Sequence, residues 1–299
     1  MSHQQLPIRS ELSNADVREW FRRNPTKEFH LSFLDPPFNQ GKEYKFFDDN
    51  IPHEEYWQWM EEVLREIFKH TVDGGSIYFM QREKNTEFVL SSLRKTGWSF
   101  QNLIIWKKKT SAVPGTNRYG KQFQVIAYAI KGERPRVFNR LRISPPLPAE
   151  YKYDRESGIF LTDIWDDIRE LTSGYFAGDE AIRAEGGERF HKQQSPVALL
   201  LRIIMSSSNV GDTVFDPFAG TGTTLVVAEQ LKRNSIGIDI DPENVKLMRR
   251  RLKEERTADD ISKYFDYYRY TEGLGGIIGS VDMKNSGAPK SKQAALFEK

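Results

Sequence analysis

A carboxylate followed by two prolines and an aromatic residue is the first group in the chain suited to chemistry. Asp35, Pro36, Pro37 and Phe38 follow an apolar run at residues 29–33. Because proline interrupts strand pairing, we expect Asp35 at the carboxyl end of a strand. The carboxylate and the carbonyls of this turn are hydrogen-bond acceptors. Two acceptors beside the ring of Phe38 suit an exocyclic amino group on a planar base, and the alternative is a simple structural bend.

A second group lies between a predicted strand and a predicted helix. Gly220 and Gly222 allow the backbone to approach a ligand closely and direct helix N–H groups toward it. A dinucleotide fingerprint would have a third glycine at position 225, where this chain has Leu225. The strand before the turn ends in Asp216, and a strand about twenty residues later ends in Asp239, which can hydrogen-bond ribose hydroxyls. The pattern favours a cofactor with a ribose but no pyrophosphate; a structural turn in another enzyme class and an NAD-linked oxidoreductase are the alternatives.

The elements that must position these groups follow from the apolar pattern. Strands are expected at 29–33, 76–80, 100–106, 123–130, 211–216 and 235–240. Helices are expected at 57–68, 84–96, 195–205 and 242–252, with another from the glycine turn to 232. This alternation predicts an α/β fold with a mainly parallel sheet and helices on its faces.

Two stretches depart from this pattern. Between 132 and 190 the periodicity fails among four prolines and an acidic segment, which predicts an inserted or appended module outside the sheet. From about residue 273 the chain is rich in Gly, Lys and Ser, which predicts flexibility.

Composition excludes several classes of protein. The 299 residues contain no cysteine, so disulfides, thiolate metal sites and thiol nucleophiles are absent. Neither a signal-peptide pattern nor an apolar stretch long enough for a membrane helix is present, and the expected location is the cytoplasm.

The net charge of +2 conceals an uneven distribution along the chain. Residues 101–150 carry ten basic and two acidic side chains, whereas 151–188 carry ten acidic and four basic ones. Cations interleaved with Trp106, Tyr119 and Phe123 suit a surface that binds a polyanion. The alternative is a solvated loop whose cations pair with the acids that follow.

Three motifs together resemble those of the S-adenosylmethionine-dependent amino-methylating DNA methyltransferases. FLDPPF at 33–38 is similar to the catalytic motif, VFDPFAGTGTT at 214–224 to the cofactor motif, and SIGIDIDPENV at 235–245 to the ribose-acid motif. The catalytic motif comes first, as in the permuted β subgroup. The resemblance implies a Rossmann-like methyltransferase sheet, with the catalytic half at 1–131, a target-recognition region at 132–190, the cofactor-binding half at 191–256 and a C-terminal extension at 257–299.

The resemblance also implies roles for particular residues. Asp35 and the Pro36 carbonyl, in the turn that includes Pro37, would accept hydrogen bonds from the target amine, and Phe38 would stack on a flipped base. S-adenosylmethionine would be bound by Asp16, Asp216, Phe218, Ala219, Gly220, Gly222, Thr223 and Asp239. DNA would be bound by Lys107, Lys108, Lys109, Arg118, Lys121, Arg134, Arg136, Arg140 and Arg142. No metal is implied. Where the family has a Lys-Pro pair, this chain has Ser195-Pro196.

The function expected from these residues is methylation of the adenine N6 in duplex DNA. Cytosine N4 is the close alternative, because cytosine also carries an exocyclic amine, but the enzymes that methylate it more often resemble Ser-Pro-Pro at the catalytic motif. Methylation of cytosine C5 is excluded because that reaction needs a cysteine. A non-catalytic DNA-binding module with a vestigial cofactor fold is the alternative from another class.

Further partners are suggested more weakly. The family resemblance suggests a homodimer and a cognate restriction endonuclease. Residues 293–297, from Gln293 to Phe297, resemble the short peptides that dock on sliding clamps.

Overall fold

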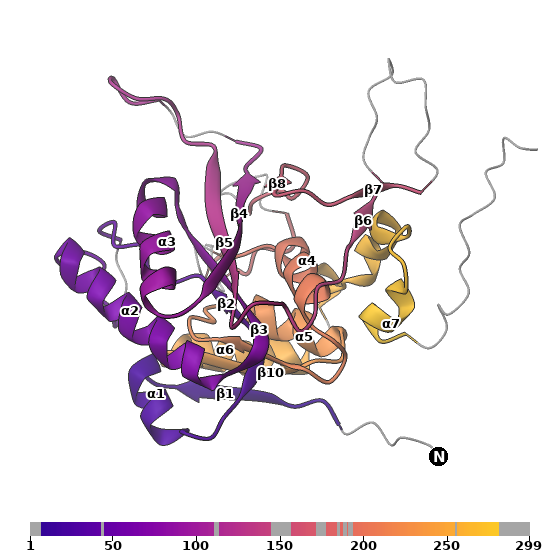
Figure 1. Ribbon diagram of the computed structural model, residues 1–299, viewed down its shortest axis with the longest axis horizontal. Coiled ribbons are helices and arrows are strands. Elements are labelled where there is room, and N and C mark those ends of the chain that lie inside the picture. Colours follow the sequence, from indigo (N-terminus) through magenta and orange to yellow (C-terminus); the bar gives the residue numbers. More distant parts are fainter. Residues whose placement is uncertain are drawn as a thin grey trace, which may run out of the picture.

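An eight-stranded sheet forms the centre of the molecule (Figure 1). The computed structural model describes residues 7–42, 45–110, 114–144, 157–171, 178–183, 186–187, 190, 194–254 and 256–280. In spatial order the strands are β1 (Ser10–Asn14), β10 (Asn234–Asp239), β9 (Thr213–Asp216), β2 (Phe29–Leu34), β3 (Thr71–Arg82), β5 (Phe123–Ile130), β4 (Ser99–Lys107) and β8 (Ile164–Trp165).

The sheet is mainly parallel, as predicted. Neighbouring strands from β1 to β3 run parallel, and β8 runs parallel to β4. Only β5 reverses, because it is antiparallel to both β3 and β4. The register pairs Ser32 of β2 with Phe215 of β9. The strands that precede the catalytic turn and the glycine turn are therefore direct neighbours, and their carboxyl ends meet at one edge.

Helices cover both faces of the sheet. One face packs against α1 (Val17–Arg23), α2 (His53–His70) and α3 (Thr86–Lys95). The other packs against α4 (Val197–Ser207), α5 (Thr223–Gln230) and α7 (Leu274–Ile278), and α6 (Pro242–Lys253) lies beside α5. Short 3-10 turns at Glu83–Asn85, Thr257–Asp259 and Ser262–Tyr268 and a small ribbon of β6 (Arg142–Ile143) and β7 (Ile159–Phe160) complete the described structure.

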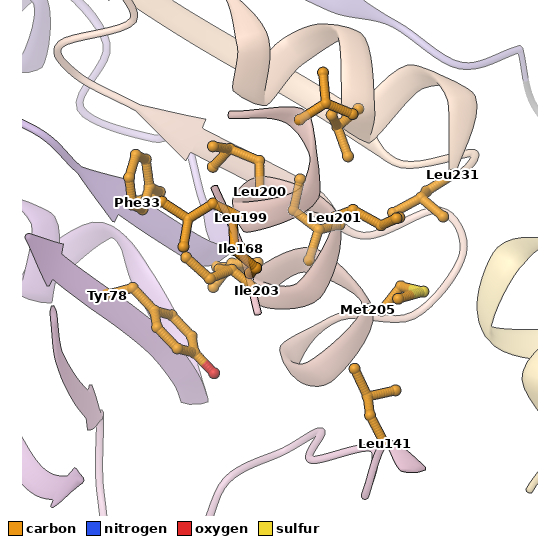
Figure 2. Close-up of a cluster of buried hydrophobic side chains, with 14 of the residues drawn as sticks. Phe33, Tyr78, Leu141, Ile168, Leu199, Leu200, Leu201, Ile203, Met205 and Leu231 are labelled. Carbon is orange, nitrogen blue, oxygen red and sulfur yellow. The ribbon is translucent and has the colours of Figure 1, made fainter. Parts of the chain in front are cut away.

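The segment at 132–190 is more integrated than predicted. Leu141 and Ile168 are buried in the same apolar cluster as α4 (Figure 2), and β8 extends the main sheet. Arg202, which is fully buried in α4, donates from Nη1 to Asp167 Oδ1 at 2.9 Å and from Nε to the Tyr268 hydroxyl at 2.9 Å. A buried guanidinium needs such partners. The prediction of a module outside the sheet is therefore wrong for these residues.

The prediction that the chain is flexible from about residue 273 is wrong for the first residues of that stretch. Residues 274–278 form α7, and both Leu274 and Ile278 are buried against the core. Their apolar side chains hold this part of the Gly-rich stretch in place. Within the described residues, no helix is both long and apolar enough to cross a membrane.

Candidate active site

A cavity of about 890 Å³ opens at the carboxyl edge of the parallel strands. Its wall includes Asp16, Asp35, Asp216, Gly220 and Asp239, and so combines the predicted catalytic and cofactor-binding residues. The volume lies within the range of small-molecule sites and leaves room for more than one ligand group. The topology brings these residues together because β2, β9 and β10 are adjacent in the sheet.

The glycine turn is held from inside by Asp216. Its Oδ2 accepts from the Thr224 hydroxyl at 2.5 Å and its Oδ1 from the Phe218 N–H at 3.1 Å. Burial raises the pKa of Asp216 to about 7, and the hydrogen bonds act against that rise. Gly222 has φ of 78°, and a Cβ there would lie 2.7 Å from Met248 Cγ. Glycine is therefore required by both backbone angle and space.

Asp239 connects the two neighbouring strand ends. Its Oδ2 accepts from the Gly220 N–H at 2.9 Å, and its Oδ1 accepts from the Asp241 N–H at 2.8 Å and the Asn244 side chain at 3.0 Å. A carboxylate offers about four acceptor positions, so these contacts leave capacity for a ligand hydroxyl. Leu225, which stands where a dinucleotide fingerprint would have its third glycine, packs against Gly237 of β10. A Cβ added to Gly237 would lie 2.7 Å from Leu225 Cδ2.

Three further predicted cofactor residues line the cavity. Asp16 caps the start of α1 by accepting from the Arg18 N–H at 2.8 Å, and Ala219 lies in the glycine turn. The Thr223 hydroxyl accepts from Arg251 Nη1 at 3.0 Å. Arg251 is itself held by both carboxylate oxygens of Asp259, each at 2.7 Å. The sequence does not mark Arg251 as a support of this turn, because it stands in a run of three arginines and only packing distinguishes it.

Asp35 lies at the catalytic edge of the cavity. Its Oδ2 accepts from the Ser195 hydroxyl at 3.0 Å. Burial raises the pKa of Asp35 to about 7, the charge of Asp216 adds to the rise, and Ser195, Lys108 and Lys42 act against it. Asp35 can therefore exist as an acceptor carboxylate or as an acid close to neutral pH.

The rest of the catalytic turn is fixed by neighbouring polar groups. The Tyr56 hydroxyl donates to the Pro37 carbonyl at 2.7 Å, and Gln81 donates to the Tyr56 oxygen at 3.0 Å. The carboxylate of Asp49 accepts from the N–H groups of the next residues, Asn39 at 2.7 Å, Gln40 at 3.1 Å and Lys42 at 3.0 Å.

Phe38 does not occupy the position expected of a base-stacking ring. It is only 4% exposed and is not part of the cavity wall, and neither is the buried Pro36. The Asp49 carboxylate accepts from the N–H groups of Asn39 and Gln40, which directly follow Phe38, and so holds the loop while the Phe38 ring stays buried. Aromatic side chains that do line the cavity are Phe33, Phe46, Phe47, Trp59, Phe190 and Phe218.

The architecture and the arrangement of this site have counterparts among known proteins. A family described as DNA methylase, N6_N4_Mtase, matches residues 29–250. This match covers both strand ends, and of the residues that line the cavity only residues 15–17 lie outside it. The chain belongs to this family of DNA methylases. The membership confirms the predicted methyltransferase class and S-adenosylmethionine as its cofactor.

Two curated relatives of this DNA methylase match along most of both chains. The DNA adenine methyltransferase YhdJ of Escherichia coli (strain K12) is 29% identical over 271 residues, which are 84% of this chain and 85% of YhdJ. The type II methyltransferase M.HpaI of Haemophilus parainfluenzae is 30% identical over 231 residues, which are 77% of this chain and 70% of M.HpaI.

Solved structures support the fold of the methylase. The PvuII DNA methyltransferase, titled cytosine-N4-specific, aligns with a TM-score of 0.61 at 18% identity over 92% of this chain and 94% of its own. The M1.HpyAVI–SAM complex aligns with a TM-score of 0.56 at 22% identity over 82% of this chain and 100% of its own. These likenesses confirm the predicted α/β methyltransferase fold.

The nine cations predicted to bind DNA do not share one surface of the methylase. Five lie at the end of β4 or in the connection from β4 to β5, which extends away from the sheet (Figure 1). They are Lys107, the last residue of β4, and Lys108, Lys109, Arg118 and Lys121 in the connection. Lys121 pairs with Glu83 at 2.8 Å, just after the carboxyl end of β3. Lys108 faces Asp35 and Glu170, and burial lowers its pKa.

The other four cations are engaged elsewhere. Arg136 forms an ion pair with Asp212, which directly precedes β9, and its N–H donates to the Gly74 carbonyl at 2.8 Å. Arg134 precedes this contact at the same edge. Because β5 is antiparallel, the chain leaves it at the amino edge of the parallel strands, opposite the cavity. These two arginines therefore lie at the edge opposite the cavity, and their predicted contact with DNA finds no support in this position.

Arg140 and Arg142 also lie away from the cavity wall. Both guanidinium groups lie over the ring of Phe160, at 4.1 and 4.2 Å from its centre. Arg142 also donates to the Gly158 carbonyl at 3.3 Å. These contacts stabilise the β6–β7 ribbon, and the predicted DNA-binding role of the pair finds no support in their position.

Proposed function

We propose that this methylase transfers a methyl group to the N6 of adenine at specific sites in duplex DNA. The observation that carries the proposal is a single cavity lined by Asp35 and by the cofactor-motif residues Asp16, Gly220 and Asp239. Adenine is favoured because Asp35, rather than serine, begins the catalytic turn, and because a relative that matches along most of its length is named a DNA adenine methyltransferase.

The residues of the cavity fit the cofactor by their chemistry. Asp239 has acceptor capacity for ribose hydroxyls, and Gly220 brings the backbone of the turn to the cavity wall without a side chain. Gly222 does not line the cavity; its missing side chain leaves room for Met248 behind the turn. Asp16 and Phe218 lie on the same wall. S-adenosylmethionine, when bound, supplies an electrophilic methyl group on a positively charged sulfur.

Asp35 acts on the substrate amine. An exocyclic amine is a weak nucleophile, because its lone pair is delocalised into the ring. The family resemblance assigns the second acceptor to the Pro36 carbonyl, although Pro36 is buried and does not line the cavity in this structure. Hydrogen bonds from the amine N–H groups to Asp35 and to a second acceptor favour the pyramidal nitrogen with a localised lone pair. They therefore stabilise the transition state more than the ground state. The nitrogen would form a bond to the methyl carbon while the carbon–sulfur bond of the cofactor breaks and its electron pair stays on the sulfur. The nitrogen gives up one proton, which the Asp35 carboxylate can accept because its pKa is about 7.

DNA would reach the cavity along the cationic connection after β4. Lys107 at the end of β4 is exposed, as are Lys109 and Arg118 in the connection, where Tyr119 is 97% exposed. Cations neutralise phosphates and an exposed ring can stack on a base. Because the amine of a paired base is enclosed in the duplex, the target base must leave the stack to reach Asp35.

The decisive experiment compares Asp35→Ala with the unmodified protein. Transfer of labelled methyl to DNA should fall to background, while binding of S-adenosylmethionine by calorimetry stays close to normal. Digestion of the product DNA should release N6-methyladenosine as the labelled nucleoside. Undiminished transfer by Asp35→Ala would contradict the mechanism, and N4-methylcytosine in the digest would replace adenine by cytosine.

Several finer expectations stay predictions. They are the homodimer, the cognate restriction endonuclease, the cytoplasmic location and the domain bounds at 131, 190 and 256. The clamp-docking peptide at 293–297 lies outside the described residues.

A further inference from the structure

One oxygen of the Asp35 carboxylate already accepts a hydrogen bond from another side chain of the protein. The Ser195 hydroxyl donates to Asp35 Oδ2 at 3.0 Å, although the two residues are 160 positions apart. Both side chains line the cavity. Because a carboxylate can rotate about its Cβ–Cγ bond, a donor on one oxygen restricts the orientation of the other. Oδ1 is thereby left to accept from a substrate.

The backbone on each side of Ser195 is held by a short segment before it. Gln194, only 6% exposed, donates to the Glu180 carbonyl at 3.0 Å and accepts from the Ile182 N–H at 3.0 Å. The Val197 N–H donates to Glu180 Oε1 at 2.6 Å. A buried amide that is satisfied at both ends fixes its own backbone position. Ser195 is therefore anchored by residues 180–182.

Charged groups around Asp35 act in opposite directions. Asp216, on the neighbouring strand end, disfavours its ionised form, whereas Lys42 in the loop after β2 and Lys108 after β4 favour it. The hydroxyl of Ser195 also favours the ionised form of Asp35. Unlike the three charges, this hydrogen bond also fixes a direction, because it holds one particular oxygen of the carboxylate.

We propose that Ser195 is a positioning residue that orients the Asp35 carboxylate and keeps Oδ1 free to accept from the substrate amine, while Gln194 and Glu180 fix Ser195 in place. This proposal rests on the proposed function. No covalent step is involved, because Ser195 retains its proton and acts only through its hydrogen bond.

Two substitutions of Ser195 test the proposal through kinetics. Ser195→Ala should lower kcat by about 10- to 100-fold at pH 7, since a hydrogen bond to a charged group is lost. KM for DNA and the Kd for S-adenosylmethionine should stay within about twofold, because the bond matters most in the transition state. Ser195→Thr keeps a hydroxyl beside the open cavity and should restore most of kcat.

Ser32→Ala is the matched control. Ser32 lies in β2, three positions before Asp35, and its buried hydroxyl has no hydrogen-bond partner among the residues that the structure describes. The same chemical change therefore removes no donor from Asp35, and kcat should be unchanged. Equal kcat values in Ser195→Ala and Ser32→Ala would overturn the proposal.

A titration without DNA separates this proposal from the proposed function. Protein labelled with ¹³C at aspartate carboxyls would be titrated by NMR, and Asp35→Asn would identify the Asp35 resonance. Ser195→Ala should move the midpoint of Asp35 to higher pH, because the lost donor favoured the ionised form, whereas Ser32→Ala should not. An unmoved midpoint would refute the contact even if DNA methylation were normal, and a moved midpoint would support it even if the substrate were not DNA.

Discussion

Gly222 provides the sharpest test of how the cofactor turn is built. An alanine at φ of 78° costs about 1–2 kcal/mol, because its Cβ crowds the backbone in the left-handed region. The Cβ would also lie 2.7 Å from Met248 Cγ, and Met248 is fully buried. Overpacking of a filled core costs about 1–3 kcal/mol. We therefore expect Gly222→Ala to lower the free energy of unfolding by about 2–5 kcal/mol.

Gly211→Ala is the matched control for this substitution. Gly211 has φ of 85°, and nothing lies within 4 Å of a Cβ at that position. It should lose only the backbone contribution of about 1–2 kcal/mol. A Gly222→Ala, Met248→Ala double variant should cost less than the sum of the two single changes, because the smaller side chain relieves the overlap.

Urea unfolding and calorimetry measure the two consequences. Gly222→Ala should weaken S-adenosylmethionine binding by at least about tenfold, or 1.4 kcal/mol, since the turn must shift to relieve the contact. Gly211→Ala should bind the cofactor normally, because it lies in the exposed turn before β9. If both alanine variants were equally stable and bound the cofactor equally well, the close approach at Gly222 would have no part in the site.

Three other predictions follow from the same structure. Tyr56→Phe removes the donor to the catalytic turn, and kcat in the methyl-transfer assay should fall by roughly 3- to 10-fold with the cofactor Kd unchanged; a normal kcat would show that the turn does not depend on this donor. The Lys107→Ala, Lys109→Ala double variant should reduce the slope of log affinity for DNA against log salt by about 2, whereas Arg136→Ala should leave the slope unaltered, and the reverse result would exchange the two surfaces. Asp35→Asn should gain stability relative to the unmodified protein as pH rises from about 4 to 7, because the raised pKa of Asp35 keeps a proton on the folded carboxyl that the unfolded chain has lost; parallel stability curves would contradict that pKa.

The sequence by itself determined the chemistry of the site and the edge of the sheet at which it lies. Proline pairs and glycine turns act on adjacent residues, so Asp35 and Asp216 could be placed at strand ends from their neighbours alone. The order of the two motifs along the chain is likewise a property of sequence. These local signals were sufficient to identify the fold class and the methyltransferase family.

Tertiary structure decided which groups surround that chemistry. The reversal of β5 carries Arg134 and Arg136 to the opposite edge, and strand direction is not visible in an apolar pattern. The inward turn of Phe38 and the contact of Ser195 with Asp35 depend on packing between segments distant along the chain. Local propensity carries no information about such contacts, because their geometry exists only once the sheet and its helices have packed together.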